Sequence, residues 1–206
     1  MSTQARLLDS WVALAGDTAR EVGAELIDRY REPHRRYHTV DHLATMLHVI
    51  DELAADADDV DAVRYAAFFH DAVYAIDRPD NEERSAELAE SVLESLGAPA
   101  ELVDEVVRLV RLTATHHAAP GDRNGSVLCD ADLAILAAAE PEYVAYTEAI
   151  RQEYHQVPDE AFRLGRAAVL RSLADQPNLF RTGIARTRFE APARANLAAE
   201  LAKLTS

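Results

Sequence analysis

The chain has 206 residues, 49% of them hydrophobic, and a formal net charge of −15. This length and apolar content predict one domain with a substantial core and exclude a disordered protein, while the negative charge argues against general nucleic-acid binding. A membrane-spanning helix needs about 18 consecutive apolar residues, and no stretch of the sequence approaches this; the first residues do not resemble a signal peptide. Cys129 is the only cysteine, which excludes intramolecular disulfides and thiolate zinc sites, so we expect a cytoplasmic protein.

Basic residues are concentrated toward the end of the chain. Residues 151–194 contain eight Arg and five acidic residues, a net charge of +3 that leaves −18 for the rest. Such asymmetry fits either an anion-binding face or helices whose surfaces form salt bridges, and we favour the second reading.

The sequence pattern is helical almost throughout, because Ala, Leu, Glu and Arg dominate and no segment alternates as a strand does. Gly16 breaks the first helical stretch, Thr39 and Asp58 or Asp59 are helix starts, and residues 116–125 form a polar loop. We predict a single all-α domain of about eight to ten helices over residues 1–206, with residues 34–140 forming the core of a site and 141–206 packing on it. The expected helical segments are 3–31 as two helices or one bent helix, 39–55, 58–71, 80–97, 99–115, 127–139, two that start at Pro141 and Pro158, and 190–204.

Three short pieces of the chain carry side chains that divalent metals bind, and His38 and His42 form the first. They are four residues apart at the start of the helix predicted from Thr39. At about 100° per residue, both lie beside the apolar stripe of this helix, whereas His48 faces water. His38 and His42 can therefore reach the edge of a core.

The second piece is the pair His70-Asp71, which ends an apolar helix. His70 falls within the apolar stripe of that helix, and Asp71 lies on its margin. A lone buried histidine is more often a hydrogen-bonded core residue than a ligand. Burying an adjacent carboxylate as well is costly unless a metal ion, or in part a His–Asp hydrogen bond, compensates for it.

The third piece, Asp130-Ala131-Asp132, is expected at the start of a short apolar helix. Two acids there suit the positive end of the helix dipole, which explains at least one of them without a metal. We expect Asp130 to be an N-cap and Asp132 to lie near the core edge. His116 and His117 precede this piece, and either a plain polar loop or a role in the site explains them.

The combination of these pieces resembles the HD-domain superfamily of metal-dependent phosphohydrolases, in which a His, a His-Asp pair and a later Asp follow one another. Further strings are similar to one branch of predicted HD-type phosphohydrolases, and the similarity covers about residues 36–200. These strings are RYH at 36–38, FHDAVY at 69–74, NEERSA at 81–86, DADLAIL at 130–136 and IRQEY at 150–154.

The resemblance implies an all-α fold and a divalent ion held by His38, His70, Asp71 and Asp132. His42 departs from the superfamily pattern, where an apolar residue is more usual, so it is a fifth ligand, a ligand of a second ion or a substrate contact. His116 and His117 fall where two-metal members insert extra histidines.

A phosphohydrolase that uses metal-activated water is therefore our prediction, with a small phosphorylated metabolite or nucleotide as substrate, because the acidic chain disfavours long polyanions. The donors suit Mn, Fe, Ni, Co, Zn or Mg, with one or two ions per chain. The oligomeric state is left open. Candidate catalytic groups are Asp71, His42, His116 and Glu82, and candidate substrate contacts are Arg36, Arg151 and Tyr154.

Two other functions use the same residues. A two-iron oxygenase accepts the same ligands, and the extra histidines would favour a binuclear centre. In a non-catalytic helical module, the donors would be core hydrogen-bonders, and Tyr143 and Tyr146 would serve only packing.

Overall fold

The computed structural model describes residues 1–205, which form ten α-helices, three short 3-10 helices and no strand. This confirms the predicted all-α class. In chain order the elements are α1 (Thr3–Ala15), η1 (Asp17–Ala19), α2 (Arg20–Arg29), α3 (Val40–Glu52), η2 (Ala54–Asp56), α4 (Val60–Phe69), α5 (Asn81–Ser95), α6 (Ala100–Leu112), α7 (Arg123–Asp132), η3 (Leu133–Ala137), α8 (Glu140–Glu153), α9 (Asp159–Ala174) and α10 (Gly183–Thr205).

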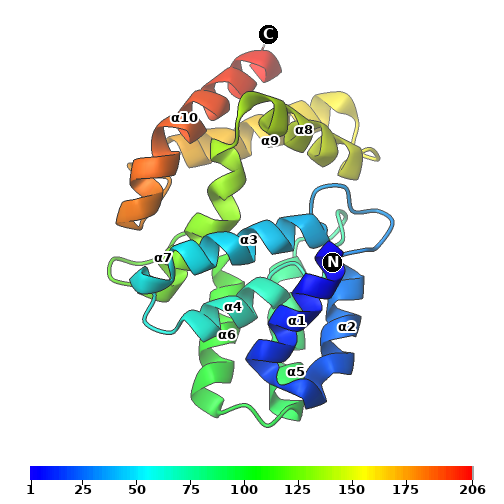
Figure 1. Ribbon diagram of the computed structural model, residues 1–206. Coiled ribbons are helices and arrows are strands. Elements are labelled where there is room, and N and C mark those ends of the chain that lie inside the picture. Colours follow the sequence, from blue (N-terminus) through cyan, green and yellow to red (C-terminus); the bar gives the residue numbers. More distant parts are fainter. Residues whose placement is uncertain (206) are drawn as a thin grey trace.

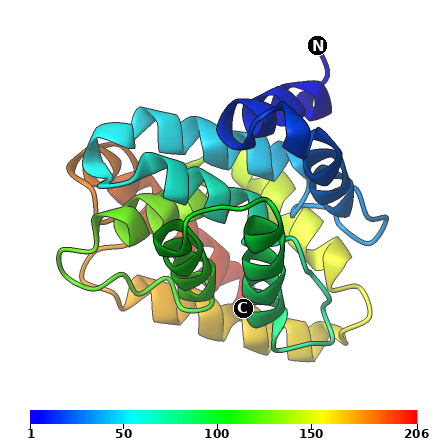
Figure 2. The same ribbon diagram turned by 90° about the horizontal axis from the view of Figure 1, so that it is seen from below.

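The helices form a lower body of α1–α6 and an upper layer of α8–α10, and α7 with η3 runs from one to the other (Figure 1). In the view from below, α3 and α4 lie side by side (Figure 2). The helices α3, α4 and α7 pack on one another in pairs, so three chain segments meet at the centre of the molecule. The core includes the fully buried Trp11, which packs edge-to-face on Phe68 and Phe69.

The starts of α3 and α4 follow local signals. Thr39 Oγ1 accepts the backbone N–H of Asp41, and Asp59 accepts those of Asp61 and Ala62. These caps satisfy N–H groups that have no partner inside the helix. They also fix where the histidines fall along each helix.

The predicted start of the helix at residues 127–139 was wrong, because α7 begins at Arg123; the predicted residues 127–137 are helical, in α7 and then η3. Asp122 caps it by accepting the N–H of Gly125. Gly125 leaves room for this cap, since a Cβ there would crowd the Asp122 carboxylate most closely and would lie 2.6 Å from Leu112 Cδ2. Asp132 is thus the last residue of α7, at the negative end of its dipole, and the dipole gives no reason for an acid at this position.

The last helix also begins earlier than predicted, at Gly183 instead of Glu190, and it continues through Pro192. Asp130 explains this start. It is not the N-cap of its own helix; it is fully buried and accepts the N–H groups of Arg181 and Thr182, 2.7 and 2.8 Å away. A contact across 52 residues therefore holds the chain where α10 begins.

No helix in residues 1–205 has both the length and the apolar character that a membrane crossing requires.

Candidate metal centre

Three helices bring His42, His70 and Asp132 together, with one ligand atom of each within 4.8 Å of the others. His42 Nε2 lies 3.2 Å from His70 Nε2 and 3.3 Å from Asp132 Oδ1. The side chains are 4%, 2% and 16% exposed, respectively. This buried group could hold a metal ion.

Asp71 and His38 extend the group. Asp71 Oδ2 lies 3.0 Å from His70 Nε2, 3.9 Å from His42 Nε2 and 4.0 Å from His38 Nε2. An ion with ligands at about 2.0–2.2 Å places neighbouring ligand atoms about 3 Å apart and opposite ones about 4 Å apart. The observed spacing fits that arrangement. We call these five side chains, His38, His42, His70, Asp71 and Asp132, the donor cluster.

Hydrogen bonds on the far side of two imidazoles assign their tautomers. His38 Nδ1 lies 2.7 Å from Glu153 Oε2, and His70 Nδ1 lies 2.8 Å from the carbonyl oxygen of Ala67. An ionised carboxylate and a carbonyl only accept, so each Nδ1 carries a proton. In the neutral ring the lone pair is then on Nε2, which faces the donor cluster. This is the arrangement that metal-binding histidines use.

Glu153 holds His38 in place, and the sequence analysis named it only as part of the matching string IRQEY at 150–154. Its side chain is fully buried, and Oε1 accepts the backbone N–H groups of residues 36, 37 and 38 at 2.7, 2.8 and 3.0 Å. Oε2 also accepts the hydroxyl of Tyr74 at 2.9 Å. Burial opposes ionisation, but the bond with His38 outweighs it and lowers the pKa of Glu153 to about 2. One feature could have drawn attention to Glu153: it lies at the C-terminal end of α8, where the helix dipole disfavours an acidic residue.

Charge in the donor cluster is balanced by protons when no cation is bound. Burial lowers the pKa of His70, but Asp71 and Asp132 outweigh burial and raise it to about 9. The pKa of His42 falls, mainly through burial. Burial raises the pKa values of Asp71 and Asp132, yet the adjacent imidazoles bring both below their usual range. A cation can replace the protons that these imidazoles carry.

Arg35 is a second residue that the sequence analysis missed. Its buried guanidinium donates to the carbonyl oxygens of Asp71, at 2.8 Å, and His38, at 3.3 Å. It also lies 5.2 Å from the ring centres of both Tyr30 and Tyr74. Arg35 thereby ties two donor-bearing segments together.

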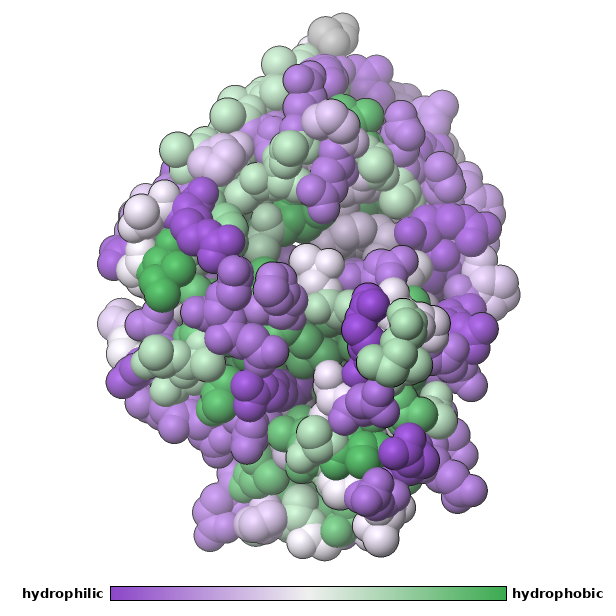
Figure 3. Space-filling model, viewed as in Figure 1, coloured by the Kyte–Doolittle hydropathy of each residue, from purple (hydrophilic) through white to green (hydrophobic). Residues whose placement is uncertain are grey.

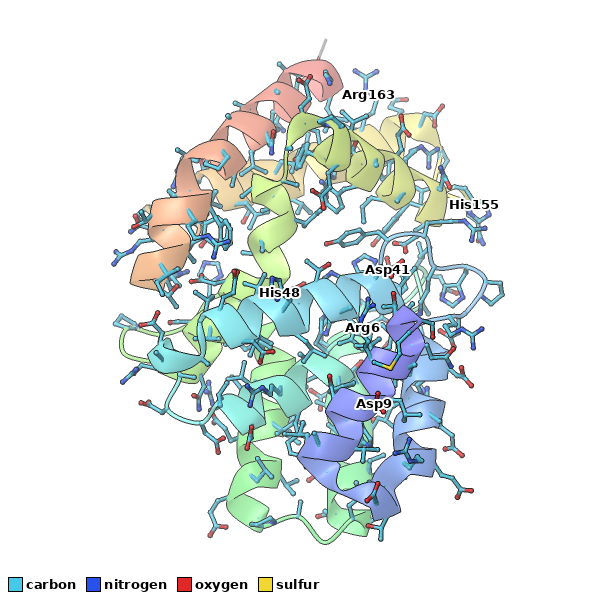
Figure 4. The ribbon with its side chains drawn as sticks, viewed as in Figure 1. Arg6, Asp9, Asp41, His48, His155 and Arg163 are labelled. Carbon is cyan, nitrogen blue, oxygen red and sulfur yellow. The ribbon has the colours of Figure 1, made fainter. Side chains whose placement is uncertain are left out.

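His116 borders the donor cluster, whereas His117 does not. His116 Nε2 lies 2.7 Å from Asp132 Oδ2, on the oxygen not directed at His42. His116 also has a left-handed backbone, with φ of 53°, which is uncommon for a residue with a side chain. His117 is exposed and contacts its own loop through Thr115. His48 faces water as predicted, with its side chain 73% exposed (Figure 4).

Two predicted substrate contacts lie at the end of α8. The Arg151 guanidinium donates to the carbonyl oxygens of Tyr154 and Val157 and to the Asp159 carboxylate. It therefore holds the turn between α8 and α9 and would have to give up these bonds to bind substrate. The Tyr154 hydroxyl meets that of Tyr74, which in turn donates to Glu153, the partner of His38.

The remaining two candidates differ in position. Glu82, in the first turn of α5, has no hydrogen bond or ion pair with the donor cluster among the described residues, and its catalytic role stays a prediction. Arg36 is exposed, and among the described residues its guanidinium donates only to the carbonyl oxygen of Arg35, at 3.3 Å. It lines a cavity of about 270 Å³ together with His42 and Asp132.

Several arginines of the basic segment form ion pairs. Arg166 pairs with Glu200 at 2.8 Å, and Arg194 pairs with Glu190 at 2.7 Å. These pairs support the salt-bridge reading of residues 151–194.

The chain matches no protein-family model, no curated protein and no solved structure.

Proposed function

We propose that the protein is a metal-dependent phosphohydrolase that hydrolyses a small phosphomonoester. The observation that carries this proposal is the donor cluster, in which His38 and His70 turn their Nε2 atoms toward Asp71. The HD-type motifs of the sequence lead to the same proposal, because they contain His38, His70, Asp71 and Asp132 as the expected ligand set.

Mixed imidazole and carboxylate donors suit Mn, Fe, Co, Ni or Zn better than an all-oxygen site would. When bound, such an ion lowers the pKa of a coordinated water and polarises a phosphate group. In the hydrolysis, the water oxygen bonds to phosphorus, the ester P–O bond breaks, and the leaving oxygen gains the proton that the water loses.

The chain's own residues have separate parts in this reaction. Glu153 and Arg35 orient His38 and Asp71, as the partners of ligands do in metal sites. His116 lies beside Asp132 at the edge of the cluster and is our candidate for moving the proton. Arg36, which lines the adjoining cavity, is our candidate for binding phosphate oxygens.

The test combines metal analysis with kinetics. Purified protein is assayed for bound metals and for hydrolysis of a generic phosphomonoester with and without Mn²⁺ or Co²⁺. We expect turnover that depends on metal in the wild type, falls by about a hundredfold or more in Asp132→Asn, and is unchanged in His117→Ala, an exposed histidine outside the cluster. Wild-type turnover by Asp132→Asn would refute the proposal.

Other outcomes identify the rival functions. Oxygen consumption by an iron-loaded, coloured protein would indicate the oxygenase. Protein that binds no metal would favour the non-catalytic module.

A further inference from the structure

The cavity beside the metal centre lies between α3, η3 and α8. Two cluster residues, His42 and Asp132, form part of its lining, so a molecule in the cavity would contact the metal centre. Figure 3 shows a hollow between the lower body and the upper layer on this face. At about 270 Å³, the cavity suits a small metabolite.

The charges that line this cavity are mixed. Arg36 is the only arginine or lysine in the lining, whereas two exposed residues, Asp41 in the first turn of α3 and Glu142 in the first turn of α8, add two carboxylates to that of Asp132. Figure 4 shows Asp41 at the end of α3 that faces α8. Neither carboxylate has a hydrogen bond or ion-pair partner within residues 1–205.

The helix dipole by itself favours an acidic residue in the first turn of a helix. An experiment must therefore distinguish this stabilising effect from a role in ligand binding. Glu140 offers this separation: it is exposed in the same turn of α8 and does not line the cavity. A dipole effect would apply to Glu140 and Glu142 alike, whereas ligand binding would involve Glu142 alone.

Aromatic rings form another part of the lining. Tyr37 and Tyr146 pack edge-to-face with ring centres 4.6 Å apart, and both border the cavity. Met46 and Ile135 add apolar surface. Such a wall accepts the carbon skeleton of a ligand, and tyrosine rings also attract cations.

We infer that the substrate is a phosphomonoester that also carries a protonated amine. Its phosphate would lie at the metal centre and Arg36, and its ammonium group would lie in the part of the cavity that the carboxylates of Asp41 and Glu142 line. A polyphosphate would instead place further negative charge against these two carboxylates. This inference rests on the proposed function and narrows its substrate class.

Matched substrate pairs test the inference, because each pair differs only in ammonium against hydroxyl. Suitable pairs are glucosamine 6-phosphate with glucose 6-phosphate, pyridoxamine 5′-phosphate with pyridoxine 5′-phosphate, and 2-aminoethyl phosphate with 2-hydroxyethyl phosphate. For the wild type loaded with its active metal, we expect kcat/KM to be roughly five- to thirtyfold higher for the ammonium member of at least one pair, as two partly solvated ion pairs would give. This ratio should fall as salt is added.

Variants test whether Asp41 and Glu142 cause the preference for the ammonium substrate. In the double variant Asp41→Asn/Glu142→Gln, the ratio should fall to about one, whereas Glu140→Gln should keep the wild-type ratio. No amine preference in the wild type, or a ratio that persists in the double variant or at high salt, would overturn the inference. Absence of metal-dependent hydrolysis of any phosphomonoester would instead refute the proposed function itself.

Discussion

The substitution Glu153→Gln tests whether a residue far along the chain sets the metal affinity of His38. The glutamine amide keeps one oxygen, which can still accept the backbone N–H groups of residues 36–38. Its NH₂ group then faces His38 Nδ1 and the Tyr74 hydroxyl. Because this NH₂ group only donates, His38 must accept on Nδ1 and carry its proton on Nε2.

The wrong tautomer removes the lone pair that His38 would offer to an ion. Loss of such a supporting partner typically weakens metal binding by about 10- to 100-fold, or about 1.4–2.7 kcal/mol. The free energy of unfolding should fall as well, by about 1–3 kcal/mol, because charge-assisted hydrogen bonds to a buried carboxylate are lost.

The assay titrates metal-free protein with Co²⁺, followed by visible absorption, and records the His38 tautomer by nitrogen NMR. Glu200→Gln is the matched control, because Glu200 is also largely buried and binds Arg166 and Tyr143 without contacting the donor cluster. It should lower stability without changing Co²⁺ affinity. Tyr74→Phe, which leaves the bond between His38 and Glu153 intact, should change affinity by less than about threefold. A folded Glu153→Gln protein that binds Co²⁺ as the wild type does would refute the reasoning.

Three further predictions concern pH and stability. First, the affinity for Co²⁺ should rise as the pH increases from about 6.5 to about 9. The reason is that the pKa of His70 is raised to about 9, so a proton must leave His70 before the ion binds. An affinity that does not change with pH would contradict this. In the same pH range the metal-free protein should lose stability. Protonated His70 contributes fully to the free energy of unfolding below its ordinary pKa, and this contribution is lost as the pH rises through its pKa of about 9 in the folded protein. Second, Asp130→Ala should reduce the free energy of unfolding in urea by about 2–4 kcal/mol, because one buried and one partly buried N–H group lose their acceptor; a change below about 0.5 kcal/mol would show that Asp130 does not hold the start of α10. Third, Gly125→Ala should lower the free energy of unfolding by about 1–3 kcal/mol despite the better helix propensity of alanine, because its Cβ would crowd the capping carboxylate of Asp122 and the side chain of Leu112; a stabilised variant would show that these two side chains move aside at little cost.

Much of the fold could be predicted because its signals act within one or two turns of helix. The caps at Thr39 and Asp59 and the break at Gly16 placed the first four helices. The four-residue spacing of His38 and His42 put both imidazoles on one side of the chain, and they lie there in the structure with ring centres 5.8 Å apart. The fully apolar surroundings of His70 in its helix likewise implied burial, and the side chain is 2% exposed.

The geometry of the candidate metal centre depends on contacts between distant parts of the chain. Asp132 ends a helix instead of starting one, because Asp122 caps that helix and a glycine allows close packing against Leu112. Glu153 fixes the orientation of His38 across 115 residues, and Asp130 fixes the start of α10 across 52. Helix propensity and hydrophobic periodicity contain no term for such pairs, since burial of a carboxylate is favourable only when packing brings its donors to it. The sequence by itself determined which residues could bind a metal, and the tertiary packing decided which of them face one another.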